Sequence, residues 1–537
     1  MGTAEAGSLL DLDWRFLLPL SSRGRFRHLL LLGAPVGAAE QLEALGVAEE
    51  VAVKPGERQP DAVVCLRCAR HGIREVAAAM PRGAAVYYEI DGPNAARFTT
   101  SRRSLRRLGF SSSALYLVHP NFEGARSYVP LDVEHALGWY LSSLGTASTV
   151  TSAALGHGAR LVGRLSPAIP ATLSPRLALV AVAGQDRDAC PAAIELAELP
   201  RNYGEPHLRP LMLVHGDERS RVVMLPFGSA SHQPLAVMKI DRRPPAEGRR
   251  EAEYAALENL RLRLSPELRE TVPQPLAIVR DGPLAATVES FLRGEWLHAR
   301  WARRSLALPE LMDDLDAVAA WLSEFHAQSR LEVRAWGENE VEHWVEQPIA
   351  EYEQAFGATA AESRLFANAR VHARDATGLR LPVVWQHWDL SSLNILRHDG
   401  VVNVVDWEAA SPGVPLDDLL YFVTRWLDRA RAGRDRRNSD TGYGAACTAL
   451  RQLFLEPRYH DPVVDAARNT IDRYMCRIEL DRRFLPLLLL HAWVRRATGR
   501  LARHEAVPGS TERPRQRNRY VAYIGVLAEH TDRLFRP

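Results

Sequence analysis

Two short polar segments, each at the end of an apolar run, constrain this chain more than any other feature. The first is HWDLSSLN, residues 387–394, which follows the run VVW almost directly. The second is the DWE that ends VVNVVDWE, residues 401–408. Short valine-rich runs bounded by polar residues predict strands. We therefore expect a strand, a polar loop and a second strand, with four polar side chains at fixed offsets: His387, Asp389, Asn394 and Asp406.

These side chains have the types and spacing that phosphoryl transfer from a nucleotide requires. That chemistry needs one carboxylate to accept a hydroxyl proton, and an amide and a second carboxylate to hold magnesium on the phosphates. Asp389 and Asn394 have the offset of the kinase loop H-R-D-L-x-x-x-N, with Trp388 in place of the arginine. Asp406 stands where the metal-binding aspartate of D-F-G would stand, but in the context DWE.

The distribution of lysine supports this interpretation. Lys54 and Lys239 are the two lysines among 67 lysines and arginines, a bias that suggests a GC-rich bacterial genome in which arginine serves wherever either cation will do. The two are not interchangeable where a compact charge must reach a phosphate. Lys239 lies in LAVMKI, residues 235–240, which matches the V-A-I-K strand whose lysine pairs with nucleotide phosphates. We expect Lys239 to bind phosphate.

A helix after this strand should supply a glutamate to orient the lysine. Residues 247–262, EGRREAEYAALENLRL, are helix-forming and place Glu253 four residues before Leu257. Glu253 is the expected partner of Lys239, with Glu251 as the weaker candidate.

Two further segments are expected to contact the nucleotide. The turn HGDERS, residues 215–220, occupies the position that covers the phosphates, with Gly216 and Ser220 as the candidate contacts. The run LAATVESFLRGEWL, residues 284–297, predicts a strand that enters a hinge between two lobes, and Glu289 is counted among its nucleotide-binding residues.

Together these motifs resemble the aminoglycoside phosphotransferase and choline kinase family of small-molecule kinases, over about residues 205–537. In that family the loop is H-G-D-x-x-x-x-N, so Trp388 replaces a glycine, and the metal motif is similar to VVDWE. A later P-x-x-D-L signature is present at residues 415–419. The resemblance implies these roles: Asp389 as base, Asn394 and Asp406 as magnesium ligands, Lys239 on the phosphates, His387 as a brace for the loop, and Asp418 as an anchor of the C-lobe.

The resemblance also implies ATP or GTP and Mg²⁺ as cofactors and the hydroxyl of a sugar, aminoglycoside, amino alcohol or similar small molecule as acceptor. The charge of the acceptor stays open, because residues 429–444 and 504–519 are rich in arginine whereas residues 338–354 are acidic. Two alternatives remain: a pseudokinase or scaffold with a regulatory nucleotide site, and a methyltransferase acting through the N-terminal part.

The first 185 residues predict a separate α/β domain. Strands are expected over 27–35, 50–53, 61–66 and 81–90, with helices over 38–45 and 70–80 and a last strand over 176–184. Strands that alternate with helices indicate a parallel sheet. The phrase MPRGAAVYYEI is similar to a turn and strand of class I S-adenosylmethionine methyltransferases. The expected acid after the second strand is missing, because Lys54 stands there, so a degenerate domain is the favoured interpretation.

The predicted fold class is thus a Rossmann-like α/β domain joined to an α+β, two-lobed, protein-kinase-like domain. The expected domains are 1–185, a linker over 186–207, an N-lobe over 208–298 and a helical C-lobe over 299–537. The linker is poor in apolar residues, so the two parts are not expected to share a core, and residues 195–537 should keep phosphotransfer alone.

Composition excludes several other classes. A formal charge of +2 predicts neither nucleic acid nor anionic membrane as a partner, and no apolar run approaches the length of a bilayer span. Cys65 and Cys68 form a single CxxC without a second pair, so they are expected to be core thiols, and a reducing cytoplasm is the expected compartment.

Overall fold

The protein is described from a computed structural model of residues 1–537. The structure describes residues 9–18, 25–66, 84–91, 109–143, 176–183, 208–214, 221–242, 249–281, 284–302, 306–432, 443–504, 515 and 518–535. The chain divides into two compact units. Unit 1 comprises Met1–Tyr254 and Gln274–Phe291, and unit 2 comprises Ala255–Pro273 and Leu292–Pro537.

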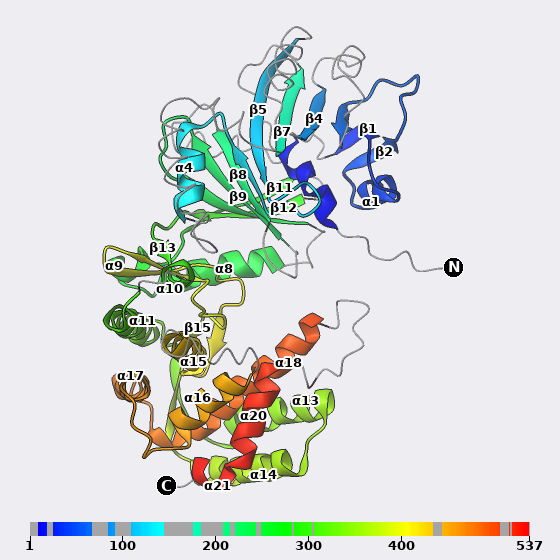
Figure 1. Ribbon diagram of the computed structural model, residues 1–537. Helices are drawn as coiled ribbons and strands as arrows, with labels where there is room; N and C mark the ends of the chain where they lie inside the picture. The colour runs from blue at the N-terminus through cyan, green and yellow to red at the C-terminus, as the bar shows by residue number, and fades with distance from the viewer. Residues whose placement is uncertain are drawn as a thin grey trace. The chain divides into compact units, whose positions relative to one another are not determined.

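Unit 1 is built around one mixed sheet, which has twelve strands among the described residues (Figure 1). The strands are β1 (Phe26–Leu32), β2 (Ala48–Ala52), β3 (Ala62–Cys65), β4 (Ala85–Asp91), β5 (Phe110–His119), β6 (Ser127–Pro130), β7 (Arg176–Ala183), β8 (Leu208–Val214), β9 (Arg221–Gly228), β10 (Ala236–Asp241), β11 (Pro275–Asp281) and β12 (Leu284–Ser290). Their order across the sheet is β11-β12-β10-β9-β8-β6-β5-β7-β4-β3-β1-β2. The described helices are η1 (Leu9–Leu17), α1 (Ala38–Ala44), α4 (Glu134–Ser143) and α8 (Arg249–Arg261), which begins in unit 1 and ends in unit 2.

The N-terminal strands pair in parallel, as their alternation with helices predicted. β1 pairs with β2 and with β3, and β3 pairs with β4, all in parallel. The helix expected over 70–80, which would connect two of these strands, lies outside the described residues. The parallel pairing is therefore present, while the Rossmann-like assignment of residues 1–185 stays a prediction.

The last predicted N-terminal strand does not lie at an edge. β7 is inserted between β4 and β5 and is antiparallel to both. β5 continues into β6, and β6 pairs with β8 at Ser127–Leu213 and Tyr128–Met212. The sheet therefore runs without interruption from strands before residues 186–207 to strands after them.

The expectation of separate cores is wrong for the described residues. Side chains of a strand alternate between the two faces of a sheet. On one face Met212 of β8 and Ile240 of β10 belong to the same apolar cluster as Leu31 of β1 and Tyr87 of β4. Helix η1 and α1 contribute to this cluster as well. We call it the η1-side core.

The opposite face has its own shared core, to which α4 contributes. Ala136 and Leu137 of α4 cluster with Leu115 of β5, Leu213 of β8 and Phe227 of β9. Both faces of the sheet thus bury side chains from both sides of the predicted linker. The reason is the β6–β8 pairing, which makes the two sets of strands one continuous surface.

Unit 2 is predominantly helical. Its helices are α9 (Pro266–Arg269), α10 (Leu297–Ala302), α11 (Leu308–Gln328), α12 (Glu338–Val341), η2 (Glu342–Glu346), α13 (Gln347–Phe356), α14 (Ala360–Asp375), α15 (Asp417–Ala432), α16 (Gly444–Phe454), α17 (Pro462–Arg477), η3 (Arg482–Phe484), α18 (Leu485–His504), α20 (Arg519–Glu529) and α21 (Thr531–Leu534). Among the described residues, two three-stranded sheets accompany them, in the orders β13-β16-β17 and β14-β15-β18. Their strands are β13 (Glu295–Trp296), β14 (Glu332–Ala335), β15 (Arg380–Gln386), β16 (Ile395–His398), β17 (Val401–Val404) and β18 (Ser411–Gly413).

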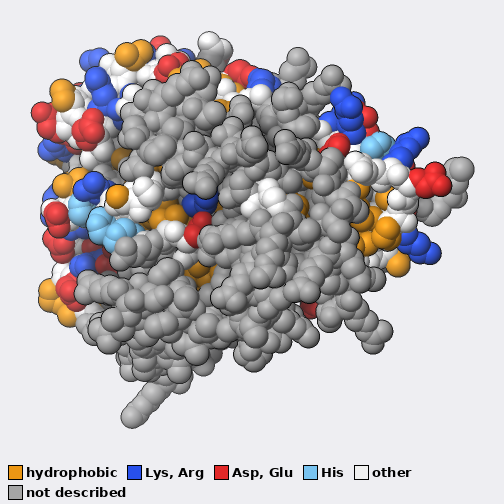
Figure 2. Space-filling view, turned by 90° about the horizontal axis from the view of Figure 1, so that it is seen from above, with side chains coloured by type: hydrophobic (Ala, Val, Ile, Leu, Met, Phe, Trp, Pro, Cys, Tyr) orange, Lys and Arg blue, Asp and Glu red, His pale blue; other side chains and the backbone are white. Residues whose placement is uncertain are grey.

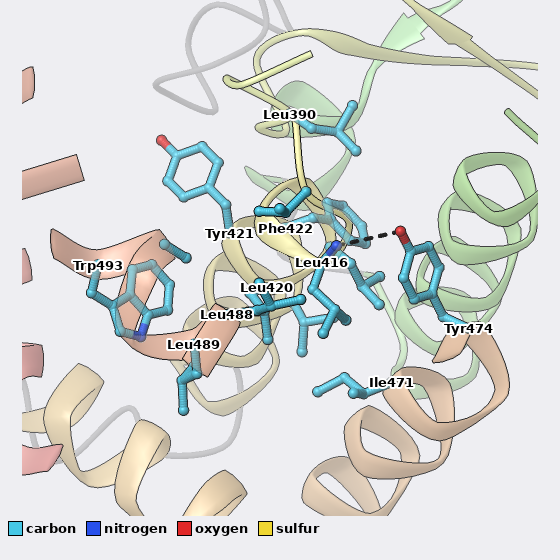
Figure 3. Close-up of a cluster of buried hydrophobic side chains, with 14 of the residues drawn as sticks. Leu390, Leu416, Leu420, Tyr421, Phe422, Ile471, Tyr474, Leu488, Leu489 and Trp493 are labelled. Atoms are coloured by element: carbon cyan, nitrogen blue, oxygen red, sulfur yellow. Dashed lines mark hydrogen bonds between the residues drawn. The ribbon is translucent and has the colours of Figure 1, made fainter. Parts of the chain in front are cut away.

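One large apolar cluster joins the helices of unit 2. Figure 3 shows the part around α15, where Leu420 lies among side chains of α17 and α18. Tyr474 of α17 lies with its hydroxyl oxygen 3.4 Å from the main-chain nitrogen of Leu416, which donates to it. This core fixes the start of α15, which follows the polar loops directly.

The described surface carries charges of both signs. On the face drawn in Figure 2, Lys and Arg side chains are interspersed with Asp and Glu side chains among the described residues. This distribution agrees with the small formal charge of the chain.

Candidate active site

Lys239 lies on the sheet face opposite to the η1-side core. Its neighbours Met238 and Ile240 belong to that core, so the alternation of β10 directs Lys239 to the other face. On the adjacent strand β12, Thr287 lies opposite Lys239, and Glu289 follows two residues later on the same face. The antiparallel register therefore places Glu289 diagonally next to Lys239.

Two carboxylates hold the ammonium group of Lys239. Its Nζ lies 3.2 Å from Oε1 of Glu289 and 3.4 Å from Oε1 of Glu253 on α8. All three side chains are at most 7% exposed. Glu251, the weaker candidate, is exposed and pairs with Arg280 instead. Glu253 lies on the helix face that buries Leu257 one turn later, whereas Glu251 does not.

The cluster around Lys239 extends to two arginines and a third carboxylate. Arg221 on β9 lies 3.5 Å from Asp241 and 3.2 Å from Glu253. Arg250 on α8 lies 3.0 Å from Glu253 and also pairs with Asp241. Together with Lys239 and Glu289, these residues make a cluster of three cations and three anions. Buried charges are tolerated when they are paired in this way. We call these six residues the Lys239 cluster.

In unit 2, the loop between β15 and β16 brings Asp389 and Asn394 together. Nδ2 of Asn394 donates to the main-chain oxygen of Asp389 at 2.9 Å and to its Oδ2 at 3.1 Å. Asp389 is half-buried, and Asn394 is 8% exposed. Because its nitrogen donates to Asp389, Asn394 has its amide oxygen to offer to a cation.

His387 holds this loop in place through both of its ring nitrogens. Its Nδ1 accepts from the main-chain N–H of Asp389 at 3.2 Å, and its Nε2 lies 2.9 Å from the main-chain oxygen of Val405. Since Nδ1 accepts, the ring proton is assigned to Nε2, which donates to Val405. Trp407 packs against the fully buried imidazole, with 4.7 Å between ring centroids. His387 thus connects the loop to the segment that leads to Asp406.

Asp406 is held next to Asn394 through the backbone. The N–H of Val405 donates to the main-chain oxygen of Asn394 at 2.9 Å. Asp406 itself has φ 67°, in the left-handed region that non-glycine residues seldom adopt. The buried Trp407 follows and donates from Nε1 to Val404 at 2.9 Å. Unit 2 therefore brings Asp389, Asn394 and Asp406 together, just as unit 1 brings Lys239, Glu253 and Glu289 together.

Trp388 adopts a backbone conformation that favours glycine. Its φ is 64°, in the left-handed region, which glycine adopts without the steric cost that other residues have there. The indole is 6% exposed, donates from Nε1 to Ser411 Oγ at 2.7 Å and lies under the guanidinium of Arg495, 3.5 Å from the ring centroid. It also packs closely on Gly413 of β18. The bulky ring is thus buried against β18.

Asp418, at the start of α15, anchors the loop from the opposite side. Its Oδ2 accepts from the main-chain N–H of His387 at 2.6 Å, and its side chain is fully buried. Burial, with a smaller contribution from the neighbouring Asp417, raises the pKa of Asp418 to about 6, against the effects of His387 and Arg496, which lower it. The P-x-x-D-L signature therefore contributes a direct contact to the loop that carries Asp389.

Sequence reasoning missed an aromatic and cationic group near the loop. Burial, with smaller contributions from Tyr520 and Asp389, raises the pKa of Tyr421 to about 12. Arg496 lies over the Tyr421 ring at 3.9 Å and pairs with Asp417. In the sequence, Tyr421 was indicated only by its position three residues after Asp418 on the same helix.

Some residues that the sequence singled out lie outside the described part of the chain. Gly216 and Ser220 lie outside the described residues, as does Cys68 of the CxxC motif. Cys65 is buried, as expected for a core thiol. Across the described ranges, no group of three or more His, Cys, Asp or Glu side chains is arranged to hold a metal ion.

Comparison with protein families identifies the part of the chain that carries these motifs. Residues 213–453 match the phosphotransferase enzyme family. We call this segment the phosphotransferase domain, after the family that it matches. It includes the Lys239 cluster, the loop of residues 387–394, Asp406 and Asp418. The match does not extend to residues 1–185, so their methyltransferase-like assignment stays a prediction.

Solved structures similar to the chain are distant. A thermostable mutant of aminoglycoside phosphotransferase APH(4)-Ia is 15% identical over 63% of this chain and 97% of its own, with a TM-score of 0.36. Macrolide 2'-phosphotransferase MphH from Brachybacterium faecium is 19% identical over 59% and 98%, with a TM-score of 0.32. Amicoumacin kinase hAmiN, solved with AMP-PNP and Ca²⁺, is 13% identical over 63% and 93%, with a TM-score of 0.35. Such low values indicate nothing about the acceptor of the phosphotransferase domain.

No curated protein is similar enough to the chain to count as a match. Among the described residues, the helices are too short or too polar to cross a membrane.

Proposed function

We propose that the phosphotransferase domain transfers the γ-phosphate of ATP to the hydroxyl group of a small molecule. In this proposal Asp389 accepts the hydroxyl proton, the hydroxyl oxygen bonds to the γ-phosphorus, and the bond from that phosphorus to the bridging oxygen breaks to release ADP. Lys239 holds the nucleotide phosphates. Glu253 and Glu289 orient its ammonium group, and Gly216 and Ser220 are the proposed contacts of the phosphate-covering turn.

The observation that carries this proposal is the bonding within the catalytic loop. Asn394 binds the carboxylate of Asp389 through Nδ2 and the segment of Asp406 through its main-chain oxygen. Asn394, itself a proposed metal ligand, thus links the proposed base to the segment of the other proposed ligand, Asp406. This arrangement favours a catalytic loop over an accidental H-x-D-x-x-x-x-N.

The donor set fits magnesium. The amide oxygen of Asn394 and the carboxylate of Asp406 are hard oxygen ligands, of the kind that Mg²⁺ takes together with substrate phosphates and water. When bound, the ion would neutralise charge on the phosphates. Asp389, engaged by the amide nitrogen, would keep its carboxylate directed at the acceptor.

The test is Asp389→Asn in the full chain, with ATP consumption measured across sugars, aminoglycosides and amino alcohols. Removal of a general base lowers turnover by about 10²–10⁴-fold, whereas nucleotide affinity should hardly change because Asp389 acts on the acceptor. Asp399→Asn is a matched control. Asp399 is exposed, and its φ of 46° suits asparagine, so turnover should stay at the wild-type value.

Two outcomes would contradict the proposal in different ways. Near wild-type turnover by Asp389→Asn would show that Asp389 is not the base. ATP binding by the wild type without transfer to any acceptor would favour the alternative of a scaffold with a regulatory nucleotide site.

A further inference from the structure

The N-terminal segment reaches the strand that carries Lys239. Helix η1 places Leu12, Trp14 and Phe16 in the η1-side core, the same cluster that contains Met238 and Ile240 of β10. All three η1 side chains are at most 1% exposed. A segment more than two hundred residues distant in sequence therefore packs against the back of this strand.

A buried ion pair joins the two segments. Oδ2 of Asp13 lies 2.5 Å from Nη2 of Arg242, and both side chains are 0% exposed. Arg15 adds a second bond, from Nη2 to the main-chain oxygen of Arg242 at 2.7 Å. Its guanidinium also lies over the ring of Phe16, 4.2 Å from the centroid. Burial lowers the pKa of Arg15 to about 10, against the charge of Asp13, which raises it.

Arg242 comes three residues after Lys239, directly beyond the end of β10. The alternation of the strand puts Lys239 and Asp241 on one face and Arg242 on the face of Met238 and Ile240. Arg250 of α8 pairs with Asp241 on the first face, and Asp13 pairs with Arg242 on the second. The end of the strand is thus held by ion pairs from both sides of the sheet.

We propose that Asp13 and Arg15 are positioning residues for Lys239, so that the N-terminal segment belongs to the nucleotide-binding machinery of this chain. This inference rests on the proposed function, in which Lys239 binds the phosphates. The physical reason is that Arg242 is a fully buried cation, and without the carboxylate of Asp13 it loses a counter-charge, which the chain relieves by moving the end of β10. A displacement of about 1 Å in a positioning group can cost about 10²-fold in activity.

The experiment measures the Kd of magnesium ATP by calorimetry on full-length variants, well below their unfolding temperatures. Asp13→Asn keeps the shape of the side chain but removes its charge, and should raise the Kd at least about tenfold. Arg15→Met is the milder second variant, because it leaves the Asp13–Arg242 pair intact. It should raise the Kd by a smaller factor and keeps the test open if Asp13→Asn does not fold.

Leu42→Ala is the matched control. Leu42 lies on α1, is fully buried and belongs to the same core, so its truncation lowers stability without touching Arg242. Lys239→Met gives the Kd expected when the phosphate contact is lost. A purely structural role for Asp13 predicts lower unfolding temperatures for Asp13→Asn and Leu42→Ala alike, with the ATP affinity of the folded protein unchanged in both.

The outcomes distinguish failure of the positioning role of Asp13 and Arg15 from failure of the proposed role of Lys239. A raised Kd for Asp13→Asn and Arg15→Met, with Leu42→Ala like the wild type, supports the inference. If Lys239→Met binds ATP weakly but folded Asp13→Asn or Arg15→Met has the wild-type Kd, the inference is overturned. An equal rise in the Kd of Leu42→Ala overturns it as well. If the wild type and Lys239→Met bind ATP equally, the role of Lys239 itself fails, and this inference fails with it.

Discussion

At the scale of single residues, two residues of the loops that carry the proposed site have left-handed backbone conformations. Trp388 and Asp406 have φ of 64° and 67°. Such conformations cost about 1–3 kcal/mol for a non-glycine residue and persist where the surroundings enforce them. For Trp388 the surroundings are Ser411, Gly413 and Arg495. The indole is therefore a structural element of the loop.

Gly413→Ala tests this role of the indole. A Cβ at this position would lie 2.7 Å from Cη2 of Trp388 and closer still to Cζ2, so the ring must move. Overpacking of this kind costs about 1–3 kcal/mol, and turnover should fall because Asp389 is the next residue. Gly499→Ala on α18 is the control. Among the described residues, and apart from its chain neighbours and its own helix backbone, no atom lies within 4 Å of its added Cβ, so stability should rise by about 0.5–1 kcal/mol with turnover unchanged. Unchanged turnover in Gly413→Ala would contradict the role.

Asp418 predicts a pH dependence of stability. Its pKa is raised to about 6 by burial, whereas in the unfolded chain it has its ordinary value of 3.8. Between these two values the folded state holds the proton that the unfolded state has lost, so the contribution of Asp418 to stability falls as pH rises from about 4 to about 6. The stability of the wild type relative to Asp418→Asn should fall over this range, by about 3 kcal/mol at most. Urea unfolding at both pH values measures it, and a constant or rising difference would contradict the assignment.

At the scale of elements, the Lys239 cluster connects β9, β10, β12 and α8. Glu253 pairs with three cations of the cluster, whereas Glu289 pairs with Lys239. The pairs of Glu253 and Arg250 with residues of β9 and β10 explain how the charged helix α8 holds a fixed place on the sheet.

Glu253→Gln should consequently destabilise the protein more than Glu289→Gln. Loss of a carboxylate that serves three buried cations is expected to cost about 3–5 kcal/mol, because each loses a partner. Glu289→Gln leaves Lys239 paired with Glu253 and should cost less. The free energies of unfolding of the two variants, measured in urea, test this ranking. Glu251→Gln, on the exposed side of the same helix, should stay within about 0.5 kcal/mol of the wild type. Equal losses for Glu253 and Glu289 would refute the ranking.

At the scale of the whole molecule, unit 1 is one folding unit across the predicted linker. Its sheet contains strands from both sides, and two apolar cores cover its faces. A chain of residues 195–537 would retain β8 to β12 without the strands, helices and apolar side chains that complete these cores.

We therefore expect residues 195–537 alone to be insoluble or unable to bind ATP, contrary to the expectation from the linker composition. Removal of β6 exposes the edge of β8, which is a template for aggregation. Removal of η1 and β1 uncovers the apolar side chains of Met212, Met238 and Ile240. Solubility and ATP affinity, compared with the full chain, measure the effect. A soluble 195–537 chain with full-length affinity would show that the shared core is dispensable.

The sequence by itself determined the local chemistry. The loop containing Asp389 and Asn394, the strand of Lys239, the helix of Glu253 and the parallel N-terminal strands follow from short-range patterns of side-chain type and spacing. Such patterns are local, because strand alternation and helix periodicity act over a few residues. The matched family covers the segment in which these motifs lie.

Only the tertiary structure decided which distant residues meet. The β6–β8 pairing, the Asp13–Arg242 ion pair and the insertion of β7 between β4 and β5 join residues separated by tens to hundreds of positions. A polar linker suggested two separate cores, but a linker's composition does not reveal whether the strands on either side pair. That choice depends on the apolar area buried when both faces of one sheet are covered, a property of the assembled chain.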